Sequence, residues 1–212
     1  MPTLSPLLLL LAAMASGTDP HPAVLVGIYD ANQTEMAAGL ELRADEHFRY
    51  GLAYGALDEE AAGRWHADGN RVILDSDPVK PPHFGLLGQQ AAPPGTVRIS
   101  LETPRGMDVQ YFDAAVLFAD GTGNGGQLSS DGISFTLKPG QRPASVRFRL
   151  GVFDLVSDPI AIDSSKGLAL RFRFEPNDLG HVDFRGTALQ EKDGELLLSR
   201  FDRVIHFRRG AH

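Results

Sequence analysis

The residues with the clearest metal-binding spacing lie in a loop that begins at Asp120. Counting Asp120 as the first position of a calcium loop, Thr122 and Asn124 supply oxygen atoms at positions 3 and 5, and Asp131 falls at position 12. Gly125, at position 6, permits the sharp turn. However, Asp is shorter than the usual Glu at position 12, and the flanks read as strands where that loop needs helices. We therefore expect a glycine-rich hairpin loop, with a calcium site as the alternative.

Three consecutive acids, Asp58, Glu59 and Glu60, lie near aromatic residues in the sequence. Acids beside aromatics are the composition of a sugar site, but glycosidase geometry depends on how two carboxylates are spaced in the fold. Adjacent acids are therefore weak candidates for a catalytic pair. We expect a solvated turn, with a binding rim or a catalytic acid as alternatives. The candidate ligand-binding residues are Tyr50, Tyr54 and Trp65, of which Trp65 is expected mainly to fill the core.

Other common chemistries leave no signature. The chain has no cysteine, no Gly-x-Ser-x-Gly and no Ser-x-x-Lys, so acyl transfer has no visible nucleophile. Its seven histidines do not occur at the i, i+2 or i, i+4 spacing of metal sites. The glycines of residues 121–126 precede a strand pattern and no lysine, which argues against a P-loop or a dinucleotide site. We expect no cofactor apart from the calcium alternative.

The charge balance disfavours nucleic acid as a partner. There are 20 basic and 27 acidic residues, which give a net charge of −7, whereas phosphate binding needs clustered Lys and Arg. Only the tail is locally basic, and its arginines alternate with apolar residues as on a solvated strand face. These arginines are Arg200, Arg203, Arg208 and Arg209.

Alternation of apolar and polar residues indicates an all-β fold with little helix. In residues 146–150 and 168–174, apolar side chains occupy every second position and arginines lie at positions between them, as in strands with one buried face. Asp-Gly and Pro-Gly turns separate many further short strands. The only helix we expect is one turn at residues 58–62, where the acids would favour a helix N-terminus.

A proline-rich stretch suggests two modules. Five prolines between residues 76 and 95 interrupt any regular strand ladder. We expect a small antiparallel meander at residues 22–77, a linker or edge segment at 78–95, and a β-sandwich at 96–212. The 42% hydrophobic content is enough for a real core.

The first fifteen residues have the pattern of a cleavable secretory signal. An apolar run at residues 7–15 ends in Ala13 and Ala15, the A-x-A pattern that a signal peptidase accepts, so cleavage before Ser16 is expected. The run is too short to cross a bilayer, and no later segment is apolar enough. Without cysteine there is no lipid attachment site. We therefore expect a periplasmic or secreted protein without a membrane span.

The first module resembles the small lipocalin-like meanders of bacterial envelope proteins. A strand at residues 40–43 ends in an acidic turn, and then follow an aromatic strand at 48–50, Gly63-Arg64-Trp65 and a Gly-Asn turn into residues 71–74. The resemblance implies a Trp that plugs the core. It also implies, as one alternative, a carrier whose cavity is lined by Leu42, Phe48, Tyr50 and Trp65.

The second module is similar to the transthyretin-like, carboxypeptidase-regulatory β-sandwich. The similarity rests on strands at residues 97–101, 114–118 and 133–137, with Asp-Gly turns after the second strand and before the third. It implies a non-catalytic accessory module. The expected function is an exported, non-enzymatic envelope protein that binds or assembles with a protein, a glycan or a small apolar ligand. The alternatives are a glycan-acting or cell-wall-acting hydrolase that uses Asp58, Glu59 or Glu60, and the lipocalin-like carrier.

Overall fold

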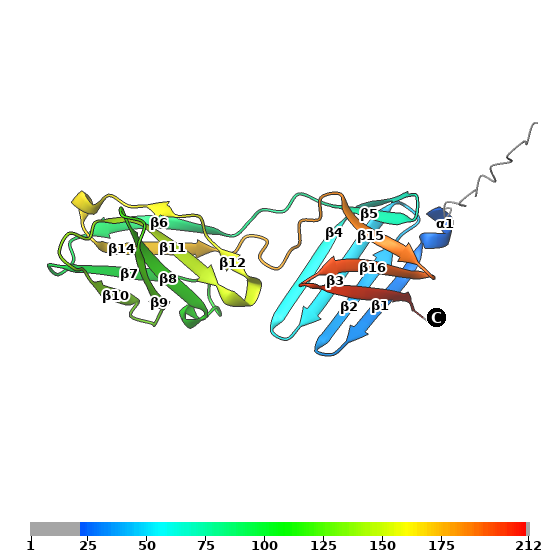
Figure 1. Ribbon diagram of the computed structural model, residues 1–212, viewed down its shortest axis with the longest axis horizontal. Helices are drawn as coiled ribbons and strands as arrows, with labels where there is room; N and C mark the ends of the chain where they lie inside the picture. Colours follow the sequence, from blue (N-terminus) through cyan, green and yellow to red (C-terminus); the bar gives the residue numbers. More distant parts are fainter. Residues whose placement is uncertain (1–21, 211–212) are drawn as a thin grey trace, which may run out of the picture.

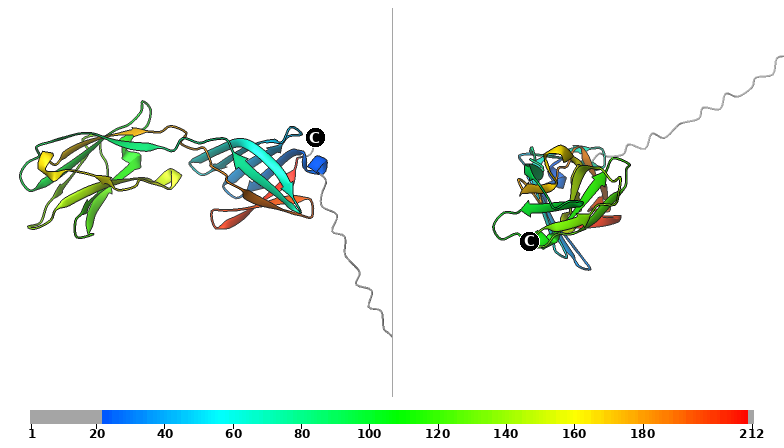
Figure 2. Two further views of the ribbon diagram at one scale, coloured as in Figure 1. Left: turned by 90° about the horizontal axis from the view of Figure 1, so that it is seen from above. Right: turned by 90° about the vertical axis from the view of Figure 1, so that its left-hand side faces the viewer.

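The computed structural model describes residues 22–210, and the expected signal segment lies outside this range. Strands dominate the described chain, as the alternation predicts. They form two bodies placed end to end and joined by two connections (Figure 1). Seen from above, the first helix lies at the outer end of one body, away from the other body (Figure 2).

The first body is a closed, eight-stranded antiparallel barrel. Its strands pair in chain order, and the last strand returns to pair with the first. They are β1 (Gly27–Gln33), β2 (Met36–Leu42), β3 (His47–Tyr54), β4 (Leu57–Asp68), β5 (Arg71–Ser76), β15 (Thr187–Lys192), β16 (Glu195–Arg200) and β17 (Arg203–Arg209). Closure leaves no free edge along most of the ladder.

Period-2 alternation decides which side chains fill the barrel. In β2, Met36, Ala38, Leu40 and Leu42 are buried while their neighbours are more exposed. The other strands follow the same rule, and their inward residues form one continuous core. The inward side chains of Leu42, Phe48, Tyr50 and Trp65 are 1–3% exposed, so they fill the barrel rather than line a cavity.

The second body is inserted between β5 and β15. It has a sheet ordered β10-β7-β14-β6 and a sheet ordered β12-β11-β8-β9, with β13 paired to β11. Its strands are β6 (His83–Gln90), β7 (Thr96–Glu102), β8 (Phe112–Phe118), β9 (Gly123–Gln127), β10 (Ile133–Thr136), β11 (Pro143–Leu150), β12 (Leu155–Val156), β13 (Ile160–Ala161) and β14 (Ala169–Glu175). Both sheets contribute to one core, in which Phe84 stacks on Phe148 at 4.8 Å. We call this body the two-sheet module.

Helices are short. The described chain has one α-helix, α1 (Pro22–Leu25), and three 3₁₀ turns, η1 (Val109–Tyr111), η2 (Gly151–Phe153) and η3 (Ser164–Lys166). Within residues 22–210, no helix combines the length and apolar character needed to span a membrane.

The chain returns from the two-sheet module along the barrel wall. Only the second half of β4 pairs with β5. In the first half, Glu60 forms an isolated bridge with the returning segment at residues 176–186, here called the return linker. The backbone N–H of Glu60 donates to the Gly180 carbonyl at 2.9 Å, and that of Val182 donates to the Glu60 carbonyl at 2.8 Å. Phe184 then enters the barrel core, where it is 4% exposed.

The two connections are also bonded to each other. The Lys80 backbone N–H donates to the Asp178 carboxylate at 2.7 Å, and the Asn177 amide donates to the Pro81 carbonyl at 2.8 Å. Because both connections are held together at this point, the two-sheet module begins and ends at one place beside the barrel (Figure 1).

The strand pairing differs from the expected division of the chain. Residues 96–212 do not form one module, because β15–β17 pair with β5 and β1 and complete the barrel. Residues 78–95 include β6, an edge strand of the two-sheet module, which explains why prolines flank it. The helical turn expected at residues 58–62 is also wrong, since these residues belong to β4 and alternate in burial.

Gly63, opposite Ser76, is where the pairing of β4 with β5 stops. A Cβ atom there would lie 2.1 Å from the Asp75 carbonyl oxygen, which is backbone and cannot move aside. We expect Gly63→Ala to lower the free energy of unfolding of the barrel by about 2–3 kcal/mol. Gly39→Ala is the control, because nothing lies within 4 Å of its Cβ position. Urea unfolding followed by fluorescence of Trp65, the single tryptophan, measures both. Equal midpoints for the two variants would contradict the close approach of the Asp75 backbone to Gly63.

Candidate functional site

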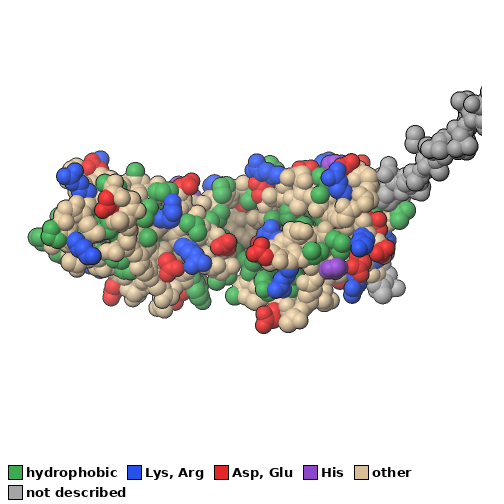
Figure 3. Space-filling model, in the orientation of Figure 1, with side chains coloured by type: hydrophobic (Ala, Val, Ile, Leu, Met, Phe, Trp, Pro, Cys, Tyr) green, Lys and Arg blue, Asp and Glu red, His purple; other side chains and the backbone are tan. Residues whose placement is uncertain are grey.

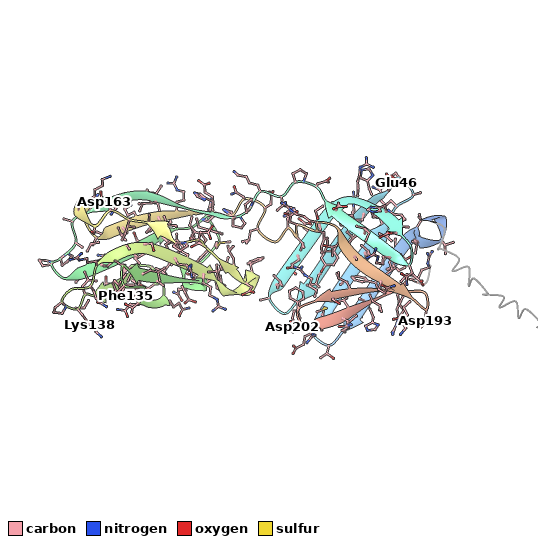
Figure 4. The ribbon with its side chains drawn as sticks, turned by 45° about the horizontal axis from the view of Figure 1, so that its top comes forward. Glu46, Phe135, Lys138, Asp163, Asp193 and Asp202 are labelled. Atoms are coloured by element: carbon pink, nitrogen blue, oxygen red, sulfur yellow. The ribbon has the colours of Figure 1, made fainter. Side chains whose placement is uncertain are left out.

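Two charged side chains occupy inward positions at one end of the barrel. Glu59 continues the inward row of β4 beyond Ala61, and Arg200 continues the inward row of β16 beyond Leu198. Figure 4 shows that Asp202, in the turn after β16, lies at the barrel end that faces the two-sheet module. We call this end the barrel mouth.

Glu59 and Arg200 form a two-point ion pair across the barrel mouth. Arg200 donates from Nε to Glu59 Oε2 at 3.1 Å and from Nη2 to Oε1 at 2.6 Å. The Glu59 side chain is 11% exposed and that of Arg200 is 26% exposed. The guanidinium also lies over the rings of Phe201, at 4.7 Å, and Phe184, at 6.0 Å. This geometry fixes the planar guanidinium in one orientation.

Tyr50 lies one step deeper in the barrel, and its hydroxyl has no partner. Its ring packs edge-on against Phe184 at 5.1 Å, and the residue is 3% exposed. Among the described residues, its hydroxyl oxygen is the one buried side-chain polar atom without a hydrogen bond. Burial raises the pKa of the Tyr50 hydroxyl, the nearby Glu59 carboxylate raises it further, and Arg200 acts in the opposite direction.

The barrel mouth opens into hollows shared with the two-sheet module. The largest has a volume of about 710 Å³ and is lined by Tyr54, Glu59, Arg200 and Phe201 from the barrel and by Phe153 from the module. A second, of about 380 Å³, lies on the return-linker side and shares Glu59, Phe153 and Arg200 with the first. A third, of about 320 Å³, continues past Phe153. We call these three hollows the junction cleft.

The rim of the junction cleft is aromatic and apolar. The Tyr54 and Phe201 rings lie 5.9 Å apart and are tilted by 50°, and the Arg203 guanidinium lies 5.2 Å from the centre of the Tyr54 ring. Phe201 and Val152 are 37% and 39% exposed, which is high for large apolar side chains that face the same hollow. Exposed apolar groups around a buried polar centre are the usual makeup of a ligand site.

The structure places one of the three candidate ligand residues, Tyr54, on the rim of the junction cleft. Tyr50 lies below the ion pair, against the Phe184 ring over which Arg200 lies, and it lines none of the three hollows. Trp65 lies elsewhere on β4, six residues or about 20 Å along the strand from Glu59. Its indole N–H donates to the Arg43 carbonyl at 3.0 Å, so it is a core residue at the opposite end of the barrel.

The three consecutive acids point in different directions. Because side chains alternate along β4, Asp58 and Glu60 are exposed on the outside while Glu59 faces the interior. Glu60 pairs on the outer wall with His181 of the return linker at 3.1 Å. The acids therefore share no cleft.

The loop that begins at Asp120 is held by its own hydrogen bonds. The Asp120 carboxylate accepts from the Thr122 N–H at 3.0 Å and from the Thr122 hydroxyl at 2.7 Å, and these bonds lower its pKa. Asn124 lies in β9, opposite Val116, and the Asp131 carbonyl accepts from Arg98 at 3.0 Å. Within residues 22–210, no three His, Cys, Asp or Glu side chains are grouped to hold a metal ion.

A further hollow, of about 650 Å³, lies on the outer face of β1–β4. It exists because Gly39 and Gly51 face each other across β2 and β3 and carry no side chains. Its polar groups are exposed, and Glu60 and His181 satisfy each other, so it offers no buried group to orient a ligand.

The sequence interpretation missed Arg200, Phe201 and Phe153. The sequence predicts Arg200 on a solvated strand face, but Arg200 lies on the same side of β16 as the buried residues Leu196 and Leu198. This alternate spacing from Leu196 and Leu198 was the sequence feature that could have indicated an inward Arg200. No sequence pattern indicates Phe153 as a site residue, because it belongs to the two-sheet module and lies near the barrel residues only in the folded protein.

Tyr50→Phe removes a buried hydroxyl that lacks a partner. We expect this change to raise the free energy of unfolding by about 1 kcal/mol at pH 7. The pKa of Tyr50 is higher in the folded protein than in the unfolded chain, so its contribution to the free energy of unfolding is fully present below pH 10. This contribution is lost at higher pH, where the unfolded residue ionises. The advantage of the variant should therefore widen above pH 10 in urea unfolding. Tyr111→Phe, at a residue that is 62% exposed, is the control. A less stable Tyr50→Phe protein would show that the hydroxyl has a partner.

Charges of both signs are interspersed over both modules on the face shown in Figure 3, so this face carries no large surface of a single charge that would be an alternative site.

Searches with family models, among curated proteins and among solved structures each find no match to this chain. The junction cleft is therefore a candidate site on the strength of its own residues alone.

Proposed function

We propose that this chain is an exported, non-enzymatic binding protein of the cell envelope and that the junction cleft is its ligand site. One observation carries the proposal. The Glu59–Arg200 pair is held with little exposure at the open end of an otherwise apolar barrel, and it faces hollows with an aromatic rim. Such a pair contributes little to stability, because desolvating the two charges offsets their attraction. A role in recognition accounts for its position.

Each module has a separate role in this proposal. The two sheets that share one core support a transthyretin-like β-sandwich, which here serves as an accessory that forms one wall of the cleft. The closed barrel supports a lipocalin-like architecture. Because its interior is filled by Leu42, Phe48, Tyr50 and Trp65, the ligand is placed at the mouth rather than inside, which disfavours the carrier alternative.

The hydrolase alternative receives less support. Glycosidases need two carboxyl groups that face the same bond from about 5–10 Å apart. Here Asp58 and Glu60 point away from the junction cleft, and both oxygens of Glu59 accept hydrogen bonds from Arg200. Glu59 alone, already paired with Arg200, lacks the second carboxyl group that this chemistry requires.

Export depends on the leader at residues 1–15. When the full chain is expressed in a bacterium, we expect the protein recovered outside the cytoplasm to begin at Ser16, because the A-x-A pattern ends at Ala15. N-terminal sequencing of that fraction measures the cleavage. Replacing Ala15 by Asp in the precursor serves as the control and should block processing. Full-length protein retained in the cytoplasm would contradict export.

Binding at the junction cleft is tested with the uncharged fluorescent probe N-phenyl-1-naphthylamine. We expect its emission to rise in the presence of the native protein, because the rim offers exposed apolar surface. Phe201→Asp should remove most of the increase. Leu87→Asp changes an apolar residue of similar exposure, 43% against 37%, on the two-sheet module away from the cleft, and should leave it unchanged. An increase that is absent, or lost equally in both variants, would contradict the proposed site.

A further inference from the structure

Two of the hollows in the junction cleft differ in polarity. The hollow of about 320 Å³ is lined by no charged side chain, and we call it the apolar hollow. The hollow of about 710 Å³ is lined by four charged side chains, and we call it the acidic hollow. The two hollows adjoin, because Ala56, Val152 and Phe153 line both of them. A single ligand can therefore reach both environments.

The apolar hollow leaves large hydrophobic side chains in contact with water. Tyr111 is 62% exposed and Val152 is 39% exposed, and Met107, Leu150 and Phe153 also line this hollow. Covering such surface with a ligand is favourable roughly in proportion to the apolar area removed from water. The apolar hollow therefore fits a hydrocarbon or aryl group.

The acidic hollow has an excess of carboxylates. It is lined by Glu59, Asp154 and Asp202, whereas Arg200 supplies its one guanidinium. Glu59 and Arg200 pair with each other, but within residues 22–210 neither Asp154 nor Asp202 forms an ion pair. Two carboxylates, one from each module, therefore remain to attract a cation and to repel an anion.

Neighbouring charges do not cancel this excess. In the hollow of about 380 Å³, Asp183 pairs with Arg185 at 2.6 Å, and the Asp178 carboxylate accepts from the Lys80 N–H at 2.7 Å. Arg203 lies over a ring of the rim but lines none of the three hollows. The charge around the junction cleft is therefore complementary to a cationic ligand.

The aromatic rings of the cleft also suit a cation. The rings of Phe201 and Tyr54 already attract guanidinium groups of the chain, whose carbon atoms lie 4.7 and 5.2 Å from the ring centres. Phe153, next to Asp154 in the sequence, lines both hollows, and no guanidinium of the described residues lies over its ring. The face of an aromatic ring attracts a cation through the ring quadrupole. Phe153 can therefore contact both a cationic group and the apolar part of one ligand.

We infer that the junction cleft binds an amphipathic organic cation, whose apolar part fills the apolar hollow and whose ammonium group lies near Asp154, Asp202 and the Phe153 ring. This inference rests on the proposed binding function and names the chemical class of its ligand. The carboxylates select the charge of the ligand, and the apolar lining supplies the contact area.

The test compares three molecules that share a phenylbutyl group and differ in their head group. They are 4-phenylbutylamine, which is cationic at pH 7, the neutral 4-phenyl-1-butanol and the anionic 4-phenylbutyrate, and each competes with N-phenyl-1-naphthylamine for the full mature chain. We expect the amine to bind at least about tenfold more tightly than the butyrate, with the alcohol between them. Raising NaCl to about 0.5 M should narrow this difference, because salt screens the carboxylates. An amine that fails to displace the probe, or binds no better than the alcohol, would overturn the inference.

Asp154→Asn and Asp202→Asn test the two carboxylates. Both residues have left-handed backbone, with φ of 48° and 54°, which Asn adopts readily, so the fold is kept. Each change should weaken amine binding about threefold or more, and the double variant should bind the amine and the alcohol about equally. Asp193→Asn is the matched control, because Asp193 is exposed, has φ of 54° and lies at the other end of the barrel (Figure 4). An amine preference that the double variant keeps, or that the control loses equally, would contradict the inference.

Val152→Gln tests the apolar hollow. It should weaken binding of the amine and the alcohol alike, because both place the same phenylbutyl group there. Val156→Gln changes an apolar residue that is 50% exposed and lines none of the three hollows, and it should leave both affinities unchanged. If the naphthylamine probe binds but the amine has no advantage, the inference fails and the binding function stands. If the probe also fails to bind, both fail.

Discussion

The pairing of the return linker with the first half of β4 is the constraint on which the arrangement of the two modules depends. β4 has twelve residues and β5 has six, so half of β4 would otherwise present a free edge. The bonds from Glu60 to Gly180 and from Val182 to Glu60 hold the chain that leaves the two-sheet module against the middle of that edge. Gly180 also receives the Phe153 ring, since a Cβ at Gly180 would lie 3.6 Å from it. One short stretch of backbone therefore closes the barrel wall and holds the far wall of the junction cleft.

Local patterns predicted the strands but not their partners. The alternation at residues 168–174 and at 146–150 corresponds to β14 and β11, and the turn residues mark many strand ends. Alternation says which face of a strand is buried, but it carries no information about which strand lies beside it. β1 and β17 pair across about 180 residues, with Tyr29 opposite Arg209. For this reason the sequence predicted two consecutive modules, whereas one module is inserted between two strands of the other.

The candidate site was predictable in part, for the same reason. The acids beside aromatic residues drew attention to Glu59 and Tyr54, which both line the junction cleft, and to Tyr50, which is buried below them against Phe184. The alternation of β4 then separates Glu59 from its two neighbours, which composition alone cannot do. Its partner Arg200 is 141 residues away, so only the barrel closure brings the two together. Phe153 comes from a different module and was beyond any local pattern.

The two ends of the barrel differ in how their polar groups are satisfied, and this difference locates function. At the end near α1, the Tyr29 hydroxyl donates to the Leu25 carbonyl at 2.7 Å, and the Trp65 indole donates to the Arg43 carbonyl at 3.0 Å. Both buried donors there are paired within the chain. At the barrel mouth the structure instead keeps an ion pair and an unpaired hydroxyl, where apolar side chains would be as stable or more stable. Natural proteins keep such destabilising groups mainly where activity requires them. This contrast supports the proposal that the ligand site lies at the mouth, and not in the filled interior or at the far end.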